Sequence, residues 1–268
     1  MPTRVSLLLF LAAFMSVVSV AAQSNPEQLQ VAPPAMRKIE PPSVGATVQE
    51  LEQQGDELRS NKAYLDALDY YTAALSKDSR SATILNKRGI TNLQLQRYKE
   101  ARKDFDQAVR VDAKFADAYN NRAVVWYEMK SYGKAVKDYK RAIIIRPDVA
   151  TYYSNMGAAY FSRKDLPNAI ASYAKALAID PDVLDHSSRT GITAQLPSPE
   201  DRAHYDYELA KLYAKMGSDD RSLQHLRKAI EEGYKGIDNV YKDAEFATLR
   251  KDPRFGQLMT GKPLAIPQ

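Results

Sequence analysis

The side chains that could do acid–base or metal chemistry are few and poorly spaced for it. The three histidines, His186, His204 and His225, have no metal-ligand spacing with one another or with a motif such as His-Glu-x-x-His. The serines lack the Gly-x-Ser-x-Gly setting of a hydrolase nucleophile. There is no cysteine, so disulfides and thiolate-bound metals are excluded. We therefore predict a protein that is not an enzyme and needs no cofactor.

Positive charge is concentrated in one part of the chain. Residues 82–149 carry 15 basic and 8 acidic side chains, a local net charge of +7, against +5 for the whole chain. Four of these cations recur at the three- and four-residue spacing that shares one helix face: Lys130, Lys134, Lys137 and Arg141. This pattern suits either a solvated face or a patch for an anionic lipid, acidic protein or wall polymer. Nucleic acid is not expected, because no aromatic-rich motif accompanies the charges.

A strict 34-residue period defines the elements that carry these side chains. Four sets of residues repeat at this period: Gly55, Gly89, Ala123 and Gly157; Ala67, Ala101, Ala135 and Ala169; Tyr71, Phe105, Tyr139 and Tyr173; Ala74, Ala108, Ala142 and Ala176. The small residues let two successive helices cross closely, and the aromatic residue fills the space beside the crossing. Such a period is typical of a helix–turn–helix array, and these arrays present extended binding surfaces.

The pattern resembles the tetratricopeptide repeat (TPR) family, whose motif runs aromatic, Leu-Gly, aromatic, Ala, aromatic, Ala, Pro. The third repeat carries Tyr119, Ala123, Trp126, Ala135, Tyr139, Ala142 and Pro147, and the fourth carries Tyr153, Gly157, Tyr160, Ala169, Tyr173, Ala176 and Pro181. The resemblance implies an all-α solenoid, a right-handed superhelix of antiparallel helix pairs. Its four repeats would span residues 48–81, 82–115, 116–149 and 150–183.

Three further segments are predicted after the fourth repeat. Residues 184–200 are predicted to be a loop or insertion, and residues 201–236 a degenerate fifth repeat. Residues 237–268 resemble the terminal block of bacterial TPR proteins, which would form a helical cap over the last apolar face, followed by a tail.

The amino-terminal region has the composition of an export signal and a linker. Residues 1–22 combine Arg4 with an apolar run over residues 5–20 and small residues before position 23, as in a secretory signal peptide. The run is shorter than the ~20 residues that span a membrane, which favours cleavage near Ala22 over an uncleaved anchor. We therefore expect a periplasmic or secreted protein. Five prolines within residues 23–47 predict a disordered or polyproline-like linker.

The resemblance also implies a binding groove, because the first helix of each TPR lines a concave surface. The corresponding positions are Asn86, Lys87, Ile90, Asn120, Asn121, Val124, Tyr127, Thr151, Ser154, Asn155, Ala158 and Phe161. Side-chain amides both donate and accept hydrogen bonds, so a ladder of asparagines suits the backbone of an extended peptide. The same asparagines could instead be consensus residues that make helix-to-helix contacts.

Three functional interpretations follow. The first is an exported adaptor that binds an extended segment of a partner protein in the groove. The second is self-association through the ends of the array. The third is binding of anionic envelope components through the basic face. A clamp for a terminal carboxylate is not expected, because Glu52 and Asp56 stand where that clamp has Lys and Asn.

Overall fold

The computed structural model describes residues 40–184 and 199–261. The chain divides into two units, Met1–Met36 and Arg37–Gln268, and the first lies outside the described residues. The predicted signal peptide, residues 23–39 of the predicted linker, most of the 184–200 loop and the tail after Gly261 lie outside them too. Among the described helices, none has both the length and the apolar composition needed to cross a membrane.

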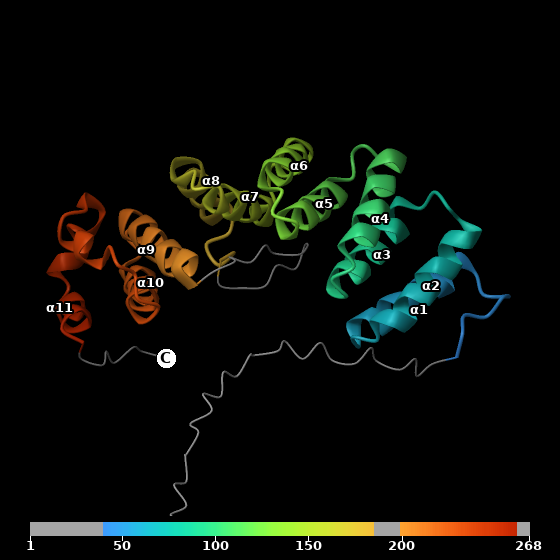
Figure 1. The fold of residues 1–268 in the computed structure, drawn as a ribbon, viewed down its shortest axis with the longest axis horizontal. Coiled ribbons are helices and arrows are strands. Elements are labelled where there is room, and N and C mark those ends of the chain that lie inside the picture. Colours follow the sequence, from blue (N-terminus) through green and yellow to red (C-terminus); the bar gives the residue numbers. More distant parts are fainter. Residues whose placement is uncertain (1–39, 185–198, 262–268) are drawn as a thin grey trace, which may run out of the picture. The chain divides into compact units, whose positions relative to one another are not determined.

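Every regular element within the described ranges is a helix, so the predicted all-helical fold is confirmed there. Eight helices follow one another as pairs, one pair in each predicted repeat (Figure 1). They are α1 (Val48–Ser60), α2 (Tyr64–Lys77), α3 (Ala82–Gln94), α4 (Tyr98–Val111), α5 (Ala116–Glu128), α6 (Tyr132–Ile145), α7 (Ala150–Ser162) and α8 (Leu166–Ile179).

The turn inside each pair has one residue with the same left-handed backbone conformation, and these residues are spaced 34 apart. Lys62, Gln96, Lys130 and Lys164 all have positive φ angles, between 57° and 63°. Each follows the end of a first helix, where a left-handed residue lets the next amide groups bond back to the last helical carbonyls. In the pair after α8 the corresponding residue is Gly217, with φ 76°.

The second helices end at equivalent positions, although only two of the four repeats have a proline there. α6 and α8 end two residues before Pro147 and Pro181. In the first two repeats Asp78 and Asp112 take the position after the helix, and each carboxylate accepts a bond from the amide two residues on. This local turn favours leaving the helix, because the side chain replaces a helical backbone bond.

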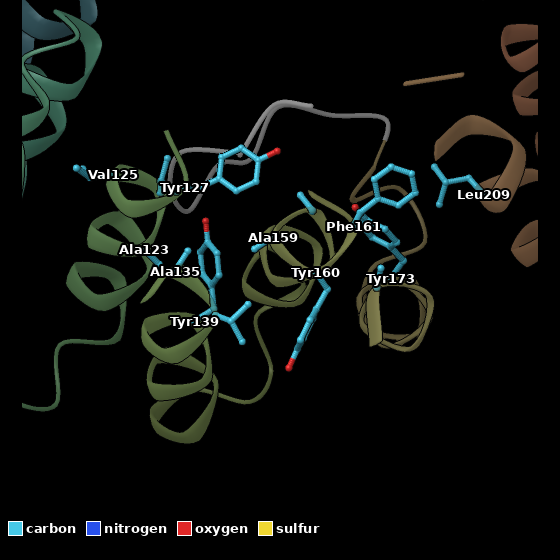
Figure 2. Packing of buried hydrophobic residues seen from close by; sticks show 14 of the residues in the cluster. Ala123, Val125, Tyr127, Ala135, Tyr139, Ala159, Tyr160, Phe161, Tyr173 and Leu209 are labelled. Atoms are coloured by element: carbon cyan, nitrogen blue, oxygen red, sulfur yellow. The ribbon is translucent and has the colours of Figure 1, made fainter. Parts of the chain in front are cut away.

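The close helix crossings leave no room for larger side chains. A Cβ atom added at Gly89 would lie 2.6 Å from Cε1 of Phe105, and one at Gly157 would lie 2.6 Å from Cε1 of Tyr173. Both rings are buried in an apolar cluster that runs from Leu93 to Tyr213. Figure 2 shows part of this cluster, including Tyr173. The predicted role of the small residues is therefore confirmed at these glycines.

The ends of the array are covered by different means. Residues of the predicted linker contact α2, since the Val44 carbonyl accepts from Lys77 Nζ at 2.9 Å. At the other end, α9 (Pro199–Lys215) pairs with α10 (Asp219–Glu231), and three short 3₁₀ helices lead to α11 (Pro253–Met259). Those 3₁₀ helices are η1 (Ile237–Tyr241), η2 (Ala244–Phe246) and η3 (Leu249–Lys251). Phe246, Leu249 and Phe255 from this last segment are buried against α9 and α10.

Candidate protein-interaction site

The predicted groove asparagines form a hydrogen-bonded row across three repeats. Asn155 Nδ2 donates to Asn120 Oδ1 at 3.1 Å, and Asn120 Nδ2 donates to Asn121 Oδ1 at 3.2 Å. Asn121 Nδ2 then donates to Asn86 Oδ1 at 3.0 Å. We call these four residues the asparagine row. They connect α3, α5 and α7 to one another, which is the helix-to-helix role that the sequence left open.

The row is largely inaccessible to solvent. Asn120 and Asn155 have no exposed surface and Asn121 has 1%, whereas Asn86 at the end of the row has 7%. The other predicted groove residues of α5 and α7, which are Val124, Tyr127, Thr151, Ser154, Ala158 and Phe161, are also buried. Burial raises the pKa of the Tyr127 hydroxyl to about 12, and this hydroxyl lies 3.0 Å from Ser162 Oγ.

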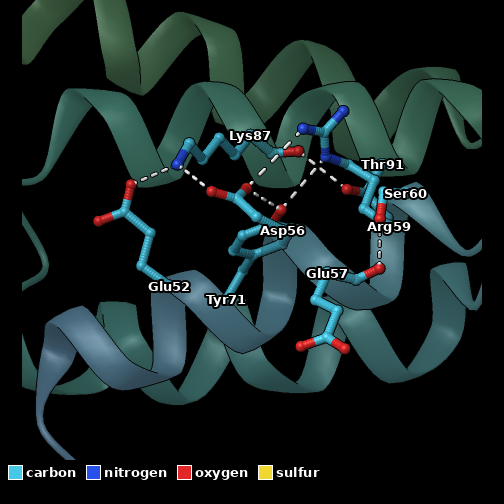
Figure 3. Close-up of polar contacts among 8 residues, drawn as sticks. All are labelled: Glu52, Asp56, Glu57, Arg59, Ser60, Tyr71, Lys87 and Thr91. Atoms are coloured by element: carbon cyan, nitrogen blue, oxygen red, sulfur yellow. Dashed lines mark hydrogen bonds and ion pairs between the residues drawn. The ribbon is translucent and has the colours of Figure 1, made fainter.

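The partly exposed part of this face lies in the first two repeats. Lys87 of α3 contacts two carboxylates of α1, with Nζ 2.6 Å from Glu52 Oε1 and 2.5 Å from Asp56 Oδ2 (Figure 3). Burial opposes the charge of this ammonium, but the hydrogen bonds that it donates to Asp56 and Glu52 outweigh this effect and raise the pKa of Lys87. Ile90, one turn along α3, is partly exposed too. We call Glu52, Asp56, Asn86, Lys87 and Ile90 the first-helix face.

A second polar feature was not predicted from the sequence: two ion pairs, each with a buried aspartate and a partly buried arginine, repeat at the same period. Arg88 contacts Asp104 through Nε and Nη2 at 3.1 and 2.6 Å. Arg122 contacts Asp138 in the same way at 2.7 and 2.8 Å. Both arginines and both aspartates lie 34 residues apart, so the spacing alone could have predicted them. Each pair joins the two helices of one repeat, which is a structural role.

One of the four predicted basic-face residues is not on the helix. Lys130 precedes α6 and forms the positive-φ turn before it, so the prediction that it continues the helical spacing is wrong. Lys134, Lys137 and Arg141 do lie on α6 and are exposed. The basic face therefore consists of α6 residues alone.

The two histidines among the described residues make packing contacts within the helical array. No group of three or more histidine, aspartate or glutamate side chains in the described ranges could hold a metal ion. His225 is buried between α9 and α10, where its Nδ1 lies 2.6 Å from Asp206 Oδ1 and its ring stacks on Tyr213. His204 stacks on Tyr234. His186 lies outside the described residues.

The asparagine row should matter to stability. We expect Asn121→Ala to lower the free energy of unfolding by about 1–3 kcal/mol, because it removes the acceptor of Asn120 Nδ2 and the donor to Asn86 Oδ1. Urea denaturation followed by circular dichroism measures this loss. Asn168→Ala, at an exposed amide that bonds only Asp165, should cost less than about 0.5 kcal/mol. An equal loss in both variants would show that the row contributes nothing of its own.

These features define a helical-repeat protein whose first helices share one polar face. Models of the tetratricopeptide repeat match residues 53–110, 86–150 and 150–183. Residues 53–183 of the chain are therefore tetratricopeptide repeats. No curated protein sequence matches the chain significantly.

Two solved structures of a protein called MamA, both of low sequence identity, share the fold. MamA residues 41–end from Desulfovibrio magneticus RS-1 is 17% identical, with a TM-score of 0.51, over 75% of this chain and 100% of that one. A further MamA structure is 20% identical, with a TM-score of 0.50, over 74% and 95%. A thermophilic TPR protein of Thermus thermophilus is 22% identical, with a TM-score of 0.49, over 80% and 100%.

Proposed function

We propose that this protein is a non-enzymatic interaction scaffold of the cell envelope, which binds an extended segment of a partner protein along the first-helix face. The observation that carries the proposal is the asparagine row, a continuous line of side-chain amides that crosses three repeats and ends at this face. The composition of residues 1–22 supports the envelope location.

A partner backbone would extend the asparagine row at Asn86 by accepting a hydrogen bond from its side-chain amide. A side-chain amide has two N–H donors, and the Asn86 Nδ2 makes no hydrogen bond to any described residue. Ile90 lies four residues along α3 from Asn86 and therefore on the same side of the helix. A peptide carbonyl would accept from Asn86 while an apolar side chain of the same segment packs on Ile90.

The charges of the first-helix face are balanced, so its apolar residue selects among partner segments. The carboxylates of Glu52 and Asp56 contact the ammonium of Lys87, and Asp56 Oδ1 also lies 3.8 Å from Arg59 Nη2. Two negative and two positive charges therefore offset one another at this site. The proposed partner segment is extended and apolar at the position that packs on Ile90.

Site-specific photocross-linking tests the proposal. A benzophenone amino acid is placed at position 90 in one variant and at position 103 in another, since Lys103 is an exposed residue on the second helix of the same repeat. We expect position 90 to capture a defined partner protein from the extracytoplasmic extract of the source cell, and position 103 not to capture it. Capture of that protein from position 103 alone, or equally from both, would contradict the proposal.

A further inference from the structure

The exposed flank of α6 is cationic and has one large apolar side chain. Apart from Gly133, its exposed residues are Lys134, Lys137, Lys140, Arg141 and Ile144, and Ile144 has 71% of its surface exposed. The helix has one acidic residue, Asp138, which is buried and bound by Arg122. The four cations are the α6 basic face.

These cations have no acidic partner among the described residues, unlike Lys87, Arg88 and Arg122, which are all ion-paired. Three of them instead lie over aromatic rings. Lys134 Nζ is 4.4 Å from the Trp126 ring centroid, Lys140 Nζ is 5.8 Å from that of Tyr160, and Arg141 Cζ is 5.9 Å from that of Tyr119. A ring attracts the cation through its quadrupole but does not neutralise it, so the charges are held in place and remain available.

The other repeats do not share this charge pattern, so it is not a general property of the array. The residues equivalent to Lys134, Lys137, Lys140, Arg141 and Ile144 are Asp66, Asp69, Thr72, Ala73 and Ser76 in the first repeat. They are Glu100, Lys103, Asp106, Gln107 and Arg110 in the second, and Asn168, Ala171, Ala174, Lys175 and Ala178 in the fourth. Only the third repeat has four cations and a large apolar residue at these positions.

We propose that the α6 basic face docks on an anionic lipid surface, with Ile144 entering the headgroup region. Cations within a Debye length of an anionic leaflet are attracted to it, and an apolar side chain between them adds burial that electrostatics alone does not provide. A lipid surface fits better than an acidic peptide, because a flat surface can contact the whole flank of one exposed helix at once. This inference rests on α6 alone and is independent of the proposed partner site on the first helices.

Vesicle binding tests the inference. The purified protein is sedimented with vesicles of phosphatidylcholine alone or mixed with phosphatidylglycerol. We expect binding only to the anionic vesicles, falling steeply as salt is raised. The triple variant K137E/K140E/R141E should bind at least about tenfold more weakly. Ile144→Ser, which leaves the charge unchanged, should weaken binding several-fold.

A matched variant controls for net charge and for the amino-terminal segment, which all variants share. K228E/K235E/K242E changes the charge by the same amount at exposed residues of α10 and the segment after it, and should bind like the parent protein. Circular dichroism checks that each variant is folded, and K137Q/K140Q/R141Q replaces the first triple if it is not. Equal losses in the two glutamate triples would overturn the inference. So would binding to soluble polyglutamate without binding to anionic vesicles, which would point to an acidic protein partner instead.

Discussion

Replacing Arg122 by methionine is expected to lower the free energy of unfolding by about 3–5 kcal/mol. The guanidinium contacts both oxygens of Asp138 and also Asp106, with its Nη1 2.9 Å from Asp106 Oδ1. Burial disfavours the charge, but the bonds with these carboxylates outweigh it and raise the pKa of Arg122. Methionine fills much of the same volume yet leaves the carboxylate of Asp138 buried without its partner.

Urea denaturation measures this loss, and a surface ion pair serves as the comparison. Arg146 Nη1 lies 3.7 Å from Asp117 Oδ2 and its side chain is 46% exposed. Arg146→Met should therefore cost no more than about 1 kcal/mol. Similar losses in the two variants would mean that burial adds nothing to the Arg122 pair.

Replacing Gly89 by leucine is expected to cost about 3 kcal/mol or more. Even the first added carbon would lie 2.6–2.9 Å from three atoms of the Phe105 ring. Phe105 has no exposed surface, so the ring cannot move into solvent, and the two helices of the second repeat must separate. The measurement is again the free energy of unfolding in urea.

Gly133 offers the matched control, because a Cβ there meets nothing within 4 Å. It lies in the first turn of α6 and its surroundings are open, so Gly133→Leu should change stability by less than about 1 kcal/mol. If Gly89→Leu were as mild as Gly133→Leu, close packing at the helix crossing would not explain the small residues of the repeat.

The helix pairs could be predicted from the sequence because each repeat has the same packing problem. Few arrangements other than two crossing helices fit a small residue such as Gly89 and a buried ring such as Phe105 at a fixed spacing. The helix ends of the first two repeats were harder to predict. Asp78 and Asp112 end α2 and α4 through local side-chain bonds, a weaker signal than proline.

The candidate site could be predicted only in part. The family register places Asn86, Asn121 and Asn155 on successive first helices, but register does not say whether an amide faces a ligand or a neighbouring helix. Which of the two the amide faces depends on the distance between adjacent first helices. The spacing of residues along the sequence does not give that distance. The sequence predicts Lys130 on a helix, whereas the structure places it in a turn. A non-glycine residue with positive φ has no clear signal in the sequence.

The affinity of the partner segment for variants of the second repeat tests the central claim most directly. The segment cross-linked from position 90 is synthesised and titrated calorimetrically into the parent protein, Ile90→Glu and Lys103→Glu. Binding along the first-helix face predicts that Ile90→Glu weakens affinity about tenfold or more, while Lys103→Glu changes it less than about twofold. Unchanged affinity for Ile90→Glu, with a loss for Lys103→Glu, would place the partner on the second helices and contradict the account.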